Sequence, residues 1–173
     1  FLERIHELWQ TRRADLLNSA GDIHSKMALA LERRDAASPA AGLGPELLRE
    51  AGMTLKRVYD PVNAGFGNAP KFPQPSQPCF LLRYALRFND AEATRMVLAT
   101  CEHMTAGGIH DQLGGGFARY SVDAQWLVPH FEKMLYDNAQ LATLYLEAFL
   151  ASGDLSHAQT ARDVLHYVLR DMT

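Results

Sequence analysis

The stretch Gly107-Gly-Ile-His-Asp-Gln-Leu-Gly-Gly-Gly-Phe-Ala-Arg-Tyr120 interrupts a chain whose apolar residues otherwise recur at helical spacing. Before it, a helical pattern starts at Asp90, which is a good N-cap residue, and the first glycines of the stretch end that helix. After it, we expect a helix from about Pro129 to Ser152, which Gly153 ends and which is followed by a helix capped by Asp154. The quoted stretch therefore predicts a structured loop between helices.

Helical patterns fill most of the remaining chain. Apolar residues three and four positions apart predict helices over residues 1–17 and 22–34, after Pro45, and over residues 79–88. No stretch of useful length alternates apolar and polar residues as a strand does. We therefore expect an all-α fold of antiparallel helical hairpins, joined alternately by short turns and by long structured loops.

The chain divides into three parts. Residues 1–34 form the N-terminal helices, residues 35–44 form a flexible connection of Ala, Ser, Pro and Gly, and residues 45–173 form the hairpins. Within the third part, the prolines and glycines of residues 61–78 exclude both a helix and a central strand, so this segment is a second shaped loop. Long loops within a compact unit are commonly functional.

Composition excludes several classes of partner. The formal net charge is −3, from 20 acidic and 17 basic residues without a long run of either sign, so we expect neither a nucleic-acid nor a membrane partner. No apolar run approaches the roughly 20 residues that cross a bilayer. Cys79 and Cys101 form no C-x-x-C motif, and no histidines have metal-ligand spacing, so we expect no metal, no cofactor and a reducing, cytoplasmic location. Phe1 in place of Met indicates a start inside a longer protein.

Three residues around the glycine-rich stretch are candidate catalytic groups: His130, Glu132 and Asp111. His130 and Glu132 fall in the first turn of the helix expected from Pro129, where the helix dipole favours a neutral imidazole and an ionised carboxylate. Those are the protonation states that a general base requires. The alternative for Glu132 is a purely structural role, in which its carboxylate only stabilises the helix N-terminus through the dipole.

Further side chains near both loops combine aromatic rings with charged and polar groups, a composition typical of sugar sites. The candidate substrate-binding residues are His110, Arg119, Tyr120, Trp126, Tyr136, Asp137 and Lys71. Each also has a structural alternative, because Trp126 can fill the core, Lys71 can bind helix carbonyls, and charged loop residues can form purely structural networks. Three consecutive glycines suggest a phosphate loop, but neither a preceding strand nor a Walker or dinucleotide motif accompanies them.

Three motifs in order resemble a known family. They are Gly65-Phe-Gly-Asn-Ala-Pro-Lys-Phe-Pro73, Gly107-Gly-Ile-His-Asp-Gln-Leu-Gly-Gly-Gly-Phe117 and Trp126-Leu-Val-Pro-His-Phe-Glu-Lys-Met-Leu-Tyr-Asp-Asn-Ala139. They are similar to those of the YyaL-type thioredoxin-domain-containing proteins, which have a spermatogenesis-associated animal relative. The resemblance covers most of the chain.

The resemblance implies an (α/α)6 toroid similar to six-hairpin glycosidases, preceded by a thioredoxin-like domain with a Cys-x-x-Cys motif. This chain lacks the thioredoxin-like part and has too few helices for six hairpins, so it corresponds to the early part of the toroid. The implied function is carbohydrate binding or an epimerase-like or glycosidase-like activity on a small sugar. The alternative is a non-catalytic interaction module coupled to a thioredoxin-like redox domain. Helix faces left uncovered predict self-association.

Overall fold

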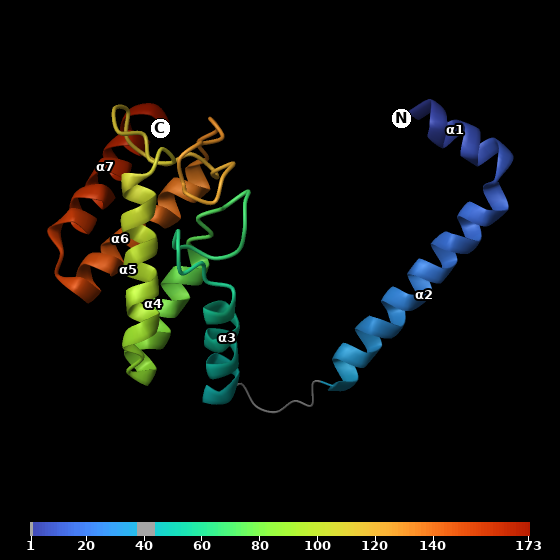
Figure 1. The fold of residues 1–173 in the computed structure, drawn as a ribbon, viewed down its shortest axis with the longest axis horizontal. Helices are drawn as coiled ribbons and strands as arrows, with labels where there is room; N and C mark the ends of the chain where they lie inside the picture. Colours follow the sequence, from blue (N-terminus) through green and yellow to red (C-terminus); the bar gives the residue numbers. More distant parts are fainter. Residues whose placement is uncertain (1, 38–43) are drawn as a thin grey trace. The chain divides into compact units, whose positions relative to one another are not determined.

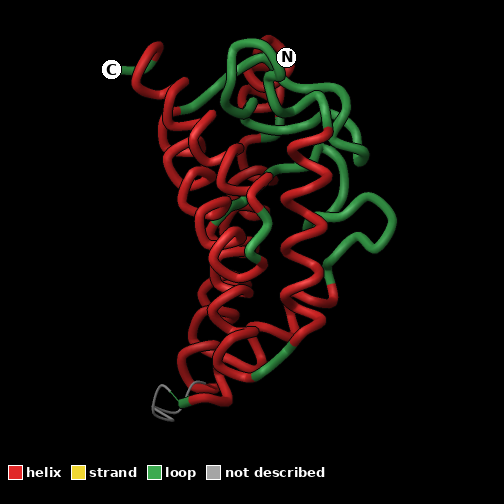
Figure 2. The backbone as a smooth tube through the Cα atoms, turned by 90° about the vertical axis from the view of Figure 1, so that its left-hand side faces the viewer, coloured by secondary structure: helices red, strands yellow, loops and turns green. Residues whose placement is uncertain are grey.

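A computed structural model describes residues 2–37 and 44–173, with only the backbone described for residues 32–37. The chain forms two compact units, Phe1–Gly44 and Pro45–Thr173, which are described separately. The described residues form helices and loops with isolated bridges but no strand (Figure 2). The predicted all-α hairpin fold is therefore confirmed.

The first unit contains α1, Leu2–Thr11, and α2, Arg13–Ala37. The prediction of a helix end near residue 17 was wrong, because the chain bends at Arg12 and α2 then continues through Gly21. A glycine inside a helix costs only about 1 kcal/mol relative to alanine, which is too little to end a long helix. The expected flexible connection began at residue 35, but α2 extends to Ala37, and the rest of that connection up to residue 43 lies outside the described residues.

The second unit contains five helices: α3, Pro45–Arg57; α4, Ser76–Phe88; α5, Ala91–Ala106; α6, Leu135–Ser152; and α7, Leu155–Asp171. The turns after α4 and α6 are short and have the expected caps. Asp90 accepts a hydrogen bond from the Ala93 N–H, and Asp154 accepts one from the Ser156 N–H. Gly153 has a left-handed backbone with φ of 74°, as a helix C-cap requires.

The two long loops lie at one end of the second unit. Residues 58–75 connect α3 to α4, and residues 107–134 connect α5 to α6. In Figure 1 both loops lie at the upper end of these helices, and the two short turns lie at the lower end. This arrangement follows from antiparallel packing, because every second connection of a helical hairpin series returns to the same end. We call this end the loop end.

The core of the second unit lies between α4, α5 and α6, and α7 packs along α6. Leu81, Val97, Leu141 and Leu144 are completely buried there. The core extends into the loop end through Phe117 and Trp126. The loops are therefore anchored by burial of apolar side chains as well as by hydrogen bonds.

Candidate functional site

The two long loops are joined by backbone hydrogen bonds. The Lys71 N–H donates to the Ser121 carbonyl at 2.8 Å, and the Ser121 N–H donates back to the Lys71 carbonyl at 2.9 Å. Ser121 is also bridged to Pro129, so one short stretch connects three parts of the loop end. The alternation of apolar and polar residues that marks a strand does not predict this pairing, because each bridge involves a single residue pair.

Lys71 is a buried structural residue. Its side chain is 0% exposed, and its ammonium group donates to Oδ2 of Asp60 at 2.7 Å, to the Ala64 carbonyl at 2.7 Å and to the Ala124 carbonyl at 3.1 Å. These bonds use all its donors. The prediction that Lys71 binds substrate is therefore corrected: the lysine binds carbonyls of both long loops.

Trp126 is likewise a core residue. Its ring is completely buried, and its indole N–H donates to the Asn63 carbonyl at 3.0 Å. The backbone of Trp126 has a φ of 67°, which is rare for an aromatic residue and shows that the surrounding structure imposes it. The ring has no exposed face on which a sugar could stack, so its predicted role in substrate binding is corrected to the structural alternative.

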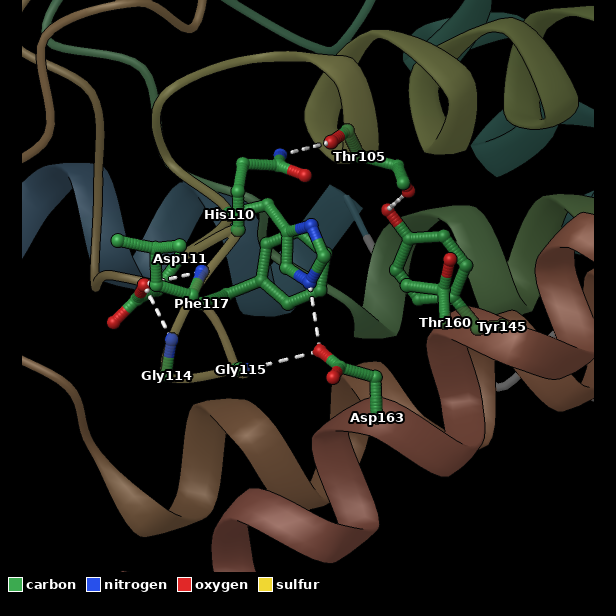
Figure 3. A network of polar contacts seen from close by, with 12 residues as sticks. Thr105, His110, Asp111, Gly114, Gly115, Phe117, Tyr145, Thr160 and Asp163 are labelled. Carbon is green, nitrogen blue, oxygen red and sulfur yellow. Dashed lines mark hydrogen bonds and ion pairs between the residues drawn. The ribbon is translucent and has the colours of Figure 1, made fainter.

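Several N–H groups of the glycine-rich stretch are paired with carboxylates of the protein. Oδ1 of Asp111 accepts from the N–H groups of Leu113 at 3.0 Å and Gly114 at 2.8 Å, which forms an Asx turn (Figure 3). The Gly116 N–H donates to Oδ2 of Asp163 at 3.4 Å. These N–H groups are therefore already paired with carboxylates of the protein, in agreement with the sequence argument against a phosphate loop.

His110 is buried beside this turn. Its Nε2 atom lies 2.9 Å from Oδ2 of Asp163 on α7, and its ring stacks on Phe117, which in turn stacks on Tyr145 (Figure 3). The Nδ1 atom is buried without a hydrogen-bond partner among the described residues. The ring thus points into the core, and Asp163 is a partner that the sequence did not reveal, since it lies in an ordinary helical pattern.

Helix α6 begins later than predicted, at Leu135 rather than near Pro129. Residues before it are held by the preceding loop, because the His130 N–H donates to the Tyr120 carbonyl at 2.9 Å and the Arg119 N–H donates to the Glu132 carbonyl at 2.7 Å. These bonds replace the helical ones. His130 and Glu132 therefore lie outside the helix, so the prediction that they belong to its first turn is wrong. Lys133, which follows them, pairs with Asp111.

Most of the remaining candidate residues gather in one group, which we call the arginine cluster. It consists of Arg119, Tyr120, His130 and Glu132. The candidates Tyr136 and Asp137 lie in the first turn of α6. Nη1 of Arg119 donates to Oε2 of Glu132 at 3.2 Å, and Nδ1 of His130 lies 4.0 Å from the same oxygen. Their side chains are 40% exposed for Arg119, 41% for Glu132 and 48% for His130. The cluster is accessible to a ligand.

Aromatic rings support one side of the arginine cluster. The Tyr120 ring stacks between Phe72 and His130, with centroid distances of 4.6 Å on each side. Phe72 belongs to the first long loop, so this stack of three rings joins the two long loops beside the arginine cluster. The stack fixes the plane of the His130 imidazole beside Glu132.

Asp111 lies in a separate cavity, whose volume is about 350 Å³. Pro129, Phe131 and Lys133 line this cavity, whereas His130 and Glu132, which alternate with them, contact the arginine cluster. Lys133 donates to Oδ2 of Asp111 and to the Gly115 carbonyl, both at 2.7 Å. The structure therefore separates Asp111 from the other two predicted catalytic residues.

The ion pair with Lys133 also controls the charge of Asp111. The ammonium group, together with the N–H groups of Gly114 and Leu113, holds the pKa of this carboxyl well below its ordinary value. Asp111 is therefore ionised at neutral pH and unsuited to act as a general acid. This fits its structural role in the turn.

The fold and the loop end define an all-α protein of helical hairpins in which two long loops build an accessible polar site. No protein-family model matches the chain. Over 99% of its length it is 38% identical to spermatogenesis-associated protein 20 of Homo sapiens and 37% identical to the Mus musculus protein of that name, and it spans 22% of each. An uncharacterized protein of Caenorhabditis elegans is 36% identical over 83% of the chain, which spans 20% of that protein.

The chain is thus a relative of the spermatogenesis-associated protein 20 proteins, and it spans about a fifth of their length. The animal relative expected from the three motifs is confirmed. No helix in the described parts of the chain is long and apolar enough to cross a membrane.

Proposed function

We propose that the arginine cluster binds a small neutral sugar, and that the chain contributes this site to a carbohydrate-binding or carbohydrate-active protein. The observation that carries the proposal is the half-exposed pair of Arg119 and Glu132 beside the stacked rings of Tyr120 and His130. A guanidinium offers donors and a carboxylate offers acceptors, which together match the paired donor and acceptor character of sugar hydroxyls. Aromatic rings beside them provide apolar surface for a sugar ring.

The separation of the carboxylates favours an epimerase-like over a glycosidase-like chemistry. A glycosidase-like mechanism built on Asp111 and Glu132 needs both carboxyl groups to flank one bond. Here Asp111 pairs with Lys133 in its own cavity, and Glu132 pairs with Arg119 in the cluster. His130 and Glu132, by contrast, share one site, where either can accept a proton.

Binding tests this proposal directly. In the complete protein, Glu132→Gln removes the negative charge that holds Arg119 and keeps the shape of the side chain. We expect it to weaken the binding of a sugar about tenfold or more, since hydrogen bonds to charged groups contribute about 1.5–3 kcal/mol. Isothermal calorimetry over a panel of neutral monosaccharides measures the effect. Glu102→Gln, at an exposed position on α5, is the matched control, and a panel that shows no difference between these proteins overturns the proposal.

A second candidate function is a non-catalytic interaction module, coupled to a thioredoxin-like domain in the longer protein. It is favoured by three apolar side chains of the second long loop, Val122, Leu127 and Val128, which are all exposed. Exposed apolar groups that lie together mark surfaces that other proteins cover. If the loop end is an interaction surface, we expect Leu127→Ser to weaken the capture of the thioredoxin-like domain. We also expect that neither the unaltered protein nor any variant binds a sugar.

Self-association is a related proposal. Leu86 on α4, Leu150 on α6 and Leu169 on α7 are exposed apolar side chains on helix faces. We expect the isolated chain to associate through such faces, with a mass in light scattering that rises with concentration. A constant monomer mass contradicts this expectation.

A further inference from the structure

Three aromatic rings at the loop end form one row of a short antiparallel pairing. Lys71 is bridged to Ser121, and Ser121 is bridged to Pro129, so these three residues lie side by side. In antiparallel segments, the next row consists of the residue after Lys71, the residue before Ser121 and the residue after Pro129. The residues of this row are Phe72, Tyr120 and His130. The His130 N–H donates to the Tyr120 carbonyl at 2.9 Å, in agreement with this register.

The alternation of side chains explains why the three rings point away from the core. Successive residues of an extended segment point to opposite faces. Lys71 and Ser121 are completely buried, so the next row points outward. Its ring centroids are 4.6 Å apart from Phe72 to Tyr120 and 4.6 Å apart from Tyr120 to His130, which is close to the spacing of paired strands. The backbone pairing therefore holds the rings in a stack.

The row leaves one aromatic face for a ligand. Tyr120 is covered by a ring on each side, so it offers no face to a sugar. His130 ends the row: one face of its imidazole lies on Tyr120, and Nδ1 at its edge lies 4.0 Å from Oε2 of Glu132. Its side chain is nevertheless 48% exposed, and Tyr120 is the only ring stacked on it in the described part of the chain. The accessible surface of His130 is therefore the outer face of the imidazole.

We propose that the outer face of His130 is the platform on which the sugar ring stacks, and that Tyr120 and Phe72 are positioning residues that hold this platform. The inference rests on the proposed function, because it assigns the stacking surface of the same site. The C–H groups of a pyranose face carry a partial positive charge, which the negative face of an aromatic ring attracts. The carboxylate of Glu132, at the edge of the imidazole, is then beside the hydroxyl groups at the rim of the stacked sugar. The site therefore selects cyclic sugars with a flat C–H face over open-chain polyols.

The stacked row can be tested without a ligand. Protons held over the face of an aromatic ring resonate at higher field, so proton NMR of the His130 ring in the complete protein reports the stacking. His130→Phe identifies the signals by their loss. We expect Tyr120→Leu to move the His130 ring signals to lower field, and Tyr120→Phe, which keeps the ring, to leave them nearly unchanged. Signals that stay in place in Tyr120→Leu overturn the proposal, because the rings are then not stacked in solution.

Sugar binding tests the platform. With methyl β-D-glucopyranoside as the cyclic probe, we expect His130→Ala to lose about two- to tenfold in affinity, the amount that an aromatic pair contributes. His130→Phe restores a flat ring that has no nitrogen atom, so we expect its affinity to stay within about twofold of that of the unaltered protein. D-Glucitol has similar hydroxyl groups on an open chain. We expect it to bind the unaltered protein more weakly than the cyclic probe and to lose no further affinity in His130→Ala.

The outcomes separate the two proposals. If Glu132→Gln weakens sugar binding but His130→Ala binds as tightly as the unaltered protein, the platform is overturned and the sugar site stands. If His130→Ala and His130→Phe lose affinity equally, the imidazole acts through its nitrogen atoms, and the platform is again overturned. If the unaltered protein binds no sugar, the sugar site fails and the platform fails with it.

Discussion

Nζ of Lys71 lies 2.7 Å from Oδ2 of Asp60, and the lysine side chain is completely buried. Removing one partner of a buried ion pair leaves the other charge without compensation, which costs about 3–5 kcal/mol. We expect Asp60→Asn to lower the free energy of unfolding by about 3 kcal/mol in urea denaturation. The exposed change Glu102→Gln is the control, and equal losses from both substitutions contradict the assigned role of the pair.

Substitutions at Gly65 and Gly67 distinguish the stability cost of backbone strain from that of a steric collision. Both have left-handed backbones, with φ of 86° and 85°, but a Cβ atom at Gly65 would collide with the buried ring of Trp126, whereas at Gly67 it would meet open space. Gly67→Ala is expected to cost about 1–2 kcal/mol, the price of the left-handed conformation. Gly65→Ala adds the displacement of the ring and is expected to cost about 1–3 kcal/mol more. Thermal unfolding that shifts equally in both variants would argue against close packing at Gly65.

Asn138 fastens α6 to the second long loop with hydrogen bonds to Phe117 and Met134. Asn138→Ala leaves buried backbone groups of Phe117 unpaired, and each such group costs about 1–3 kcal/mol. We therefore expect a loss of at least about 2 kcal/mol in unfolding free energy. Gln140→Ala, on the exposed side of the same helix, should change stability by less than about 0.5 kcal/mol. A small effect at Asn138 would show that the loop is held mainly by its apolar residues.

Stability should fall in acid because of Asp111. The hydrogen bond from Lys133, followed by those of the Gly114 and Leu113 N–H groups, lowers the pKa of this carboxyl in the folded protein. The unfolded chain binds the proton more readily, so the stabilisation is complete above the ordinary value of about 3.9 and is lost as pH falls below it towards the lower folded pKa. Urea titrations between about pH 5 and pH 2.5 should show a shallower decline for Asp111→Asn than for the unaltered protein. If stability falls equally steeply with pH in both proteins, Asp111 is not the cause of the loss of stability in acid.

The helices of the second unit were predictable because their signals are local. Asp90, Gly153 and Asp154 act within a few residues of their own positions, and their expected caps are present. The start of α6 was not predictable from such signals. Residues 130–133 have no local feature that forbids a helix, and their conformation is set by hydrogen bonds to Arg119 and Tyr120 in the preceding loop.

The site was predictable in composition but not in arrangement. The sequence predicts that Arg119, Tyr120, His130 and Glu132 belong to one candidate site, and these four residues do lie together. Burial of Lys71 and Trp126, and the separation of Asp111, depend on contacts between loops that are distant in the chain. A single sequence contains no periodic signal for such contacts, because each involves isolated residues.

The connections at the two ends of the hairpin unit also differ in how quickly they can form. The short turn after α6 brings neighbouring residues together, whereas the bond from Lys71 to the Ala124 carbonyl joins positions 53 apart. Closing a long segment of chain costs more entropy than closing a turn, and contacts distant in sequence slow folding. We therefore expect the helical pairs to form first during refolding, and the arginine cluster to be among the last parts of the molecule to acquire its final geometry.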